Sequence, residues 1–503
     1  MPASCNLLPS NTSVLKIKIL YFAGLISLAI GAVYFATEMV ANVFFIFTLI
    51  AYFLSKDEPF WLAFFLALHD GFFGFFGAFE TTLAALPGLP AIEVTQLYIL
   101  LSVIKARMAK PGYRPFYQTH LAILGIYLAF LVLQGYIVGL APAMNIRFRV
   151  LKDIVPLLAF YSIPRLFDTK KSYRELFVYL FFIALFAFAA QAMNIFFFQS
   201  PPVYFGISNA LNEFDMEITP DNPYRGFYNV DVVLITLFGA FFFLARKTKG
   251  FPSVLCYLII ATNLLIAFLS ASRGWILFFS LVTVSFFLFI EKLSPKKILA
   301  FAAVSSVLLG LALFQPAIQT QAEGTMKRLQ TLKALKQGDI TAGGTLLRLS
   351  VRGPRVMKQW KASPLAGWGF SDHFYQYRDG HVGNQNILMH SGLAGLLLLY
   401  SFFGYFLFKL GALSFRLPPD HPDKKAALVF LIFFAGWFFL HSTSGQQFGY
   451  FALPTKGLTQ SLFFSLGAYL YYSARGGRTE NSTCTANQTN EKEELPERPV
   501  LEN

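Results

Sequence analysis

The chain has 503 residues, of which 55% are hydrophobic, 17% aromatic and only 14% charged, and its formal net charge is +14. Soluble domains are typically about 45–50% apolar and about 25% charged, so this composition excludes an ordinary soluble enzyme or binding domain. We predict an all-α fold, a polytopic integral membrane bundle of about 12–14 transmembrane helices.

Apolar runs of the length that crosses a bilayer, about 20 residues with a range of about 17–25, recur along the chain. They predict an N-terminal transmembrane bundle over 1–314 and further transmembrane helices over 391–473. The segment 474–503 is polar and lacks aromatic residues, which predicts a disordered tail. The predicted span cores are 17–36, 39–54, 59–79, 91–104, 119–140, 148–163, 176–198, 229–245, 251–270, 274–290, 298–314, 391–411, 426–441 and 455–472.

Short cytoplasmic loops of membrane proteins are rich in Lys and Arg. With the spans above, the short basic loops all fall on one side, and both termini join them there; we predict that this side is cytoplasmic. The long loop 315–390 then lies on the exterior side, and loops longer than about 60 residues are largely exempt from the charge rule. The short basic loops are 105–114, 168–175, 246–250, 291–297 and 418–425.

The exterior loop 315–390 carries ten Lys or Arg and four Asp or Glu. Arg348 and Arg352 are four positions apart, which places them on one face of a short helix. Pro354 suits the first turn of a second short helix that carries Arg355. Guanidinium groups bind phosphate oxygens in pairs, so this pattern is typical of a site for a lipid-linked diphosphate. The alternative is attraction to anionic lipid headgroups, worth about 1 kcal/mol per cation.

Arg273 stands at another exterior boundary, between two apolar runs and without an acidic neighbour in sequence. It either extends to the interface or joins the loop arginines on a phosphate. At the end of the loop, His381 is a candidate general base toward a sugar hydroxyl, because an unperturbed histidine titrates near pH 6.5. His373 and His390 compete for this role. Nearby amides and aromatic rings suit sugar hydroxyls and sugar faces: Asn384, Asn386, Trp368, Tyr375 and Tyr377.

Three motifs in this order resemble the O-antigen ligase and O-antigen polymerase superfamily. The first is Ser272-Arg273-Gly274 at an outer membrane boundary, and the second is the arginine-led helix and Pro-Leu-x-Gly-x-Gly turn within 348–370. In the third, His381 precedes the Gly-x-x-Gly of 392–395 by eleven positions. The sequence departs from the family at Val382, where Asn, Ser or Gln is usual.

The resemblance implies an inverting, metal-independent glycosyl transfer at the periplasmic face of a bacterial inner membrane. The donor would be a polyprenyl-diphosphate-linked oligosaccharide and the acceptor a glycan or lipid A-core, with no cofactor and no nucleic acid. The sequence shows no Asp-x-Asp or paired-histidine motif that would demand a metal. The implied catalytic residues are His381, Arg273 and Arg348, and the implied substrate-binding residues are Arg352, Arg355, Asn384, Asn386 and Trp368.

Acceptor choice stays open among a ligase, a polymerase and a transferase that glycosylates protein hydroxyls. A different class, a polysaccharide or glycolipid transporter or flippase, also stays open. His69 and Asp70 stand near the middle of the span 59–79, with Glu80 at its end, and ionisable groups within a membrane are candidates for proton relays. The alternative for this pair is a hydrogen-bonded role in the bundle interior.

Overall fold

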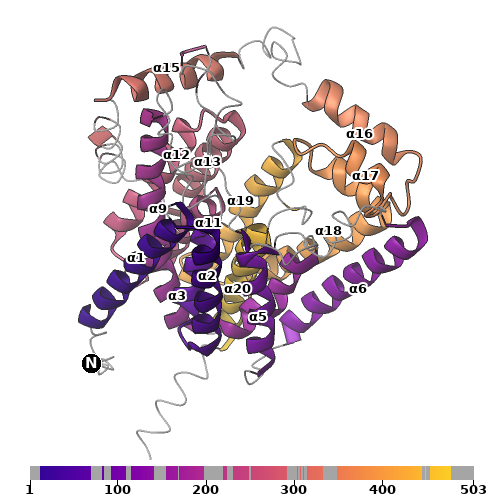
Figure 1. Ribbon diagram of the computed structural model, residues 1–503, viewed down its shortest axis with the longest axis horizontal. Helices are drawn as coiled ribbons and strands as arrows, with labels where there is room; N and C mark the ends of the chain where they lie inside the picture. Colours follow the sequence, from indigo (N-terminus) through magenta and orange to yellow (C-terminus); the bar gives the residue numbers. More distant parts are fainter. Residues whose placement is uncertain are drawn as a thin grey trace, which may run out of the picture.

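The computed structural model is a bundle of helices (Figure 1). Its strands within the described ranges are β1 (Thr82–Leu83) and β2 (Ile92–Glu93), which form an antiparallel pair. The regular structure of the described residues is otherwise helical, which is compatible with the predicted all-α fold. The structure describes residues 12–34, 36–68, 82–83, 92–108, 115–140, 154–167, 169–197, 219–221, 223, 230–248, 251–291, 299, 303, 306, 307, 310, 314–331, 348–443, 448 and 454–476.

Five segments within the described helices are long and apolar enough to cross a membrane, which supports the prediction of a membrane protein. These segments are Gln118–Val138, Lys170–Ala192, Arg273–Glu291, Asn384–Arg416 and Pro422–Ser442. They belong to α6 (Pro115–Val138), α9 (Lys170–Phe197), α13 (Arg273–Phe286) with the π-turn η3 (Phe287–Glu291), α18 (Asn384–Arg416) and α19 (Pro422–Thr443).

The bundle also contains further helices. They are α1 (Thr12–Tyr34), α2 (Glu38–Leu54), α3 (Glu58–Ala67), α5 (Val94–Met108), η1 (Val155–Leu158), α8 (Ala159–Leu166), α11 (Val230–Arg246), α12 (Ser253–Leu269) and α20 (Pro454–Gly476).

The described helices differ in detail from the predicted span 148–163. Over 148–163, its described part is η1 followed by α8, with Pro164 inside the helix; at 1.5 Å per residue this piece is only about 18 Å long. Within α18 the backbone breaks at Gly392, which separates a short first helix from the long apolar segment close to the predicted boundary at 391. Most of the predicted span 298–314 lies outside the described residues.

Helix α11 lies at the centre of the bundle, where almost all of its side chains are buried. Its Phe238 ring lies 4.7 Å from Phe430, 4.8 Å from Phe463 and 5.3 Å from Phe433, counted between ring centroids. A Cβ atom at Gly239 would overlap the ring of Phe177 on α9. A phenylalanine-rich sequence thus forms one continuous aromatic core, since aromatic rings pack favourably at such distances.

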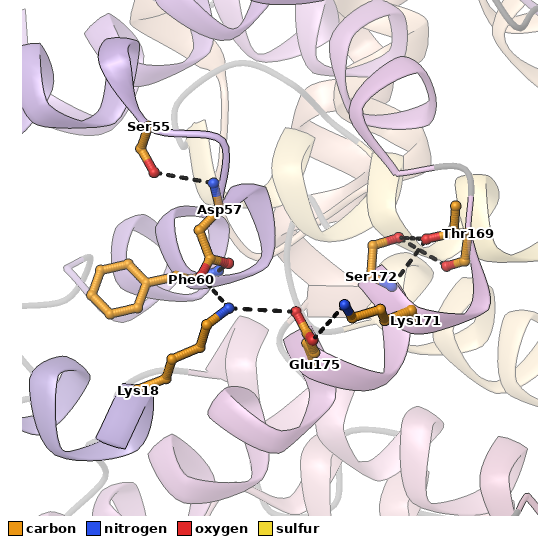
Figure 2. A network of polar contacts seen from close by, with 8 residues as sticks. All are labelled: Lys18, Ser55, Asp57, Phe60, Thr169, Lys171, Ser172 and Glu175. Carbon is orange, nitrogen blue, oxygen red and sulfur yellow. Dashed lines mark hydrogen bonds and ion pairs between the residues drawn. The ribbon is translucent and has the colours of Figure 1, made fainter. Parts of the chain in front are cut away.

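Ion pairs join helix ends that the charge pattern assigns to the cytoplasmic side. Lys18 Nζ on α1 lies 2.7 Å from Asp57 Oδ2 between α2 and α3, and 3.9 Å from Glu175 Oε2 on α9 (Figure 2). Two other pairs, Lys105 with Glu58 and Arg246 with Asp423, connect α5 to α3 and α11 to α19. These contacts bring together segments that are far apart in the sequence.

The loop predicted at 315–390 contains short helices, as expected. They are α15 (Pro316–Gln330), the π-turn η5 (Arg348–Arg352), α16 (Gly353–Trp360) and α17 (Asp372–Tyr377). Helix α15 lies against the end of α12, where Gln321 Nε2 donates to the Leu269 carbonyl at 2.6 Å. Helix α16 contacts α18 instead, and Figure 1 shows α15 and α16 at separate places along the bundle.

Candidate functional site

Helix α16 is amphipathic and lies on the first turns of α18. Pro354 stands in its first turn. A backbone N–H there has no partner within the helix, so the N–H that proline lacks costs no hydrogen bond. Val356 is fully buried, while Arg355 and Lys358 are exposed. The helix therefore packs its apolar side on the bundle and presents its cations outward.

An open groove of about 500 Å³ runs between α16 and the start of α18. It is lined by Gly353, Pro354, Met357, Lys358, Lys361 and Gln385. The two lysines bring positive charge to the groove, and neither was singled out from the sequence as a binding residue.

Asp379 is the carboxylate that organises the loop arginines. Its side chain is only 7% exposed, and Arg355 Nη2 lies 2.8 Å from its Oδ2 atom. Arg352 Nη1 lies 3.5 Å from the other oxygen, Oδ1. The two arginines, predicted to bind substrate, are thus held side by side by one acid. The sequence analysis missed Asp379, although it is one of only four acids in a basic loop and directly precedes Gly-His.

The same aspartate fixes the turn that carries His381. Its Oδ1 atom accepts the backbone N–H of His381 at 2.9 Å, and its own N–H donates to Asn386 Oδ1 at 3.1 Å. Asn386 Nδ2 in turn donates to the carbonyls of Asp379 and, at 2.6 Å, Val382. Asn386 is fully buried. Its amide therefore closes the turn, and the predicted role of a sugar contact does not fit this position.

Asn384 and Trp368 also bond to protein groups. Asn384 Nδ2 donates to Ser442 Oγ at 2.9 Å, and its Oδ1 atom accepts the hydroxyl of Tyr400, so the amide joins α18 to α19. Trp368 Nε1 donates to the Gln359 carbonyl at 2.9 Å. Trp368 keeps a partly exposed ring, whereas the amide of Asn384 is already committed to two hydroxyl groups.

The glycines of the resembling motifs form a backbone contact between the loop and α18. Gly367 and Gly392 have φ values of +71° and +62°, which favour glycine. A Cβ atom at Gly367 would lie 2.5 Å from the Gly392 nitrogen and the His390 carbonyl oxygen. Trp368 N–H donates to Met389 O at 2.8 Å, and Leu393 N–H to Pro364 O at 2.9 Å. The loop thus bonds to α18 on both sides of the kink at Gly392.

Gln134 of α6, which the sequence did not point to, completes this contact. Its Nε2 atom donates to the His390 carbonyl at 2.7 Å and to the Ala366 carbonyl. Because α6 and α18 lie side by side, a Cβ atom at Gly395 would meet Phe130 of α6 at 2.9 Å. The Gly-x-x-Gly motif therefore has a structural reason, which is close packing around the kink.

The three competing histidines have different environments. His390 is fully buried, with its ring 4.6 Å from Phe370 and 4.7 Å from Phe374. His373 lies 4.0 Å from the Trp368 ring, and partial burial lowers the pKa of its imidazole. His381 is the exposed one of the three, so it is accessible from outside the protein.

Val382, which departs from the family motif, is buried next to His381, with an exposed fraction of 1%. Its side chain points into the core, while its carbonyl accepts Asn386 as described above. The position of the departure is therefore one where an apolar side chain is stabilised by burial.

Arg273 lies elsewhere. It is the first residue of α13, and its Nη1 atom donates to Thr331 Oγ1 at the end of α15 at 2.7 Å. The hydrogen bond from Arg273 thus leads to α15, whereas Arg352 and Arg355 contact Asp379. The structure does not bring these three arginines to one point. The side chain of Arg348 lies outside the described residues.

No protein-family model matches this chain, and no curated protein matches its sequence. The site itself therefore carries the functional argument. Within the described part of the chain, no three His, Cys, Asp or Glu side chains lie close enough together to hold a metal ion. His69, Asp70 and Glu80, the candidates for a transport pathway, lie outside the described residues.

Proposed function

We propose that this chain is a membrane glycosyltransferase of the O-antigen ligase or polymerase type, acting at the periplasmic face of a bacterial inner membrane. One observation carries the proposal: Asp379 gathers Arg352 and Arg355 and fixes the turn of His381 at the start of α18. Cations that bind a diphosphate and a base for an acceptor hydroxyl are thereby joined through one residue.

The arginines keep donors for a substrate. A guanidinium has five N–H donors, and each contact with Asp379 uses one of them. The side chains of Arg352 and Arg355 are 39% and 54% exposed. The carboxylate therefore holds both guanidinium groups near one point while their side chains stay partly exposed, a suitable arrangement for binding phosphate oxygens.

In the proposed reaction the acceptor hydroxyl attacks the anomeric carbon of the donor sugar, and the bond from that carbon to the diphosphate oxygen breaks. His381 takes the proton of the hydroxyl. The polyprenyl diphosphate leaves with the electron pair, and Arg352 and Arg355 stabilise its charge, together with Lys358 and Lys361 of the adjoining groove. The fixed donors lower the barrier because they are already in place when the charge develops.

The test uses the full chain in proteoliposomes with a defined polyprenyl-diphosphate-linked repeat unit. Products are separated into glycans that grow on the carrier and glycans that appear on another acceptor. The paired variant Arg352→Ala with Arg355→Ala should lower the transfer rate at least about 100-fold, because the loss of even one charge-stabilising group has an effect of that size. His381→Ala should lower the rate at least about 100-fold as well, because it removes the general base. Arg378→Ala is the matched control, because its guanidinium lies over the Tyr375 ring, 5.1 Å away.

A flippase is the competing class, and the same vesicles test it. If the arginine and histidine variants keep full activity while Asp70→Asn abolishes translocation of a fluorescent lipid-linked glycan, the glycosyltransferase proposal is wrong. If the control Arg378→Ala loses as much transfer as the paired variant, the specific role of Arg352 and Arg355 is wrong.

A further inference from the structure

A second hollow lies far from α16, between the C-terminal parts of α18 and α20, two helices labelled in Figure 1. Its volume is about 370 Å³. The lining combines the cations Lys409, Arg416 and Arg475 with apolar and aromatic groups that include Phe408 and Tyr471. No residue proposed for glycosyl transfer is among them.

Two of the three cations of this hollow have aromatic rather than acidic neighbours. Arg475 Nη1 donates to the Tyr471 hydroxyl at 2.7 Å, and Lys409 Nζ lies 5.2 Å from the Tyr405 ring centroid. Among the described residues, no carboxylate lies within 4.0 Å of Lys409, Arg416 or Arg475. The hollow therefore concentrates positive charge that an anion would balance.

Helix dipoles explain only part of this pattern. Arg416 and Arg475 are in the last turns of α18 and α20, where cations are stabilised by the carbonyl ends of the helices. Lys409 is seven positions before Arg416, or about 10 Å deeper along the helix. A dipole acting over the last turn does not account for a lysine at that depth, but a ligand that reaches into the hollow does.

The position of the hollow fits a membrane boundary. From the kink at Gly392 to Arg416, α18 is about 36 Å long at 1.5 Å per residue, which is close to the roughly 30 Å of a bilayer core. Phe408 and Phe415 on the same helix are 70% and 89% exposed. Exposed rings beside clustered cations match the acyl chains and the headgroup of one lipid molecule.

We propose that this hollow binds the phosphate headgroup of an anionic phospholipid from the leaflet opposite α16. Arg416 and Arg475 bind the phosphate oxygens, Lys409 reaches it from the deeper side by extending its ammonium group toward the interface, and the acyl chains lie along Phe408. Basic pockets between transmembrane helices bind anionic lipid headgroups in this way. The site is independent of the proposed glycosyl transfer.

The experiment is native mass spectrometry of the purified full chain in detergent, titrated with phosphatidylglycerol or with phosphatidylcholine. Near a membrane surface each cation contributes about 1 kcal/mol to anionic lipid binding, or roughly fivefold in affinity. Arg416→Gln with Arg475→Gln should therefore weaken phosphatidylglycerol binding about 25-fold and leave phosphatidylcholine binding unchanged. Lys170→Gln with Lys171→Gln removes equal charge from exposed positions on α9 and should change neither.

A charge-preserving variant, Arg416→Lys with Arg475→Lys, separates lost binding from lost folding, and it should retain most of the affinity. An equal loss of phosphatidylglycerol affinity in the glutamine variant and in the α9 control would overturn the proposal, because the net charge of the protein, and not the position of these cations, would then determine binding. Glycerol 3-phosphate tests whether the ligand is a soluble phosphate instead of a lipid. If it displaces phosphatidylglycerol at equimolar concentration, the ligand is a soluble phosphate and the lipid assignment is wrong.

Discussion

Asp379→Asn is the substitution that most directly probes how the loop is built. It removes the charge that holds Arg355 at 2.8 Å and Arg352 at 3.5 Å, but it keeps an oxygen for the His381 N–H. A hydrogen bond between charged groups contributes about 1.5–3 kcal/mol. The arginines here are 39% and 54% exposed, and solvent screening reduces that contribution. We therefore expect a loss of about 1–2 kcal/mol in the stability of the turn.

A double-mutant cycle isolates the contact from other effects. Asp379→Asn is combined with Arg355→Gln in one cycle and with Arg352→Gln in another. The Arg355 cycle should give a coupling of about 1–2 kcal/mol, and the Arg352 cycle less than half of that, because 3.5 Å is at the limit of a hydrogen bond.

The assay is backbone hydrogen exchange of residues 379–387, measured by mass spectrometry with the chain in nanodiscs. A change of 1–2 kcal/mol corresponds to about 5–30-fold faster exchange through local opening. A coupling below about 0.5 kcal/mol for Arg355, or a larger coupling for Arg352 than for Arg355, would show that Asp379 does not organise the arginines.

Three further predictions concern parts of the fold around the site and the ion-paired end. Gly367→Ala should destabilise the protein by at least about 2 kcal/mol, because the left-handed backbone conformation disfavours alanine and the added Cβ atom would also overlap the backbone of α18. The control Gly380→Ala adds a Cβ atom in open space and should be near neutral. Thermal unfolding measures both variants. Burial lowers the pKa of His373, so the unfolded chain takes up its proton first. Stability should therefore fall as pH drops below about 6.5, and a His373→Gln variant should show a smaller fall in melting temperature between pH 8 and pH 5. Lys105→Met leaves Glu58 buried without its partner and should cost about 3–5 kcal/mol; adding Glu58→Gln should recover most of the loss, and a double variant less stable than the single one would contradict this.

The sequence was sufficient for the fold class and for the composition of the loop. Apolar runs of spanning length require helices because a bilayer offers backbone groups no partners, and the helices α6, α9, α13, α18 and α19 lie where such runs were expected. Pro354 predicted the first turn of the short helix α16. These features depend on neighbours within a few residues, so local sequence determines them.

Only the tertiary structure decided which polar groups are available. Asn386 resembles a sugar ligand in sequence, but it is fully buried and bonds to the backbone of its own turn. Gln134 stands 256 positions before His390, and no local pattern indicates that it bonds to that carbonyl. Asp379 was missed because an acid in a basic loop gains its role only when the chain folds Arg352 and Arg355 onto it. Long-range pairing of this kind depends on helix packing, which residue types and spacing do not specify.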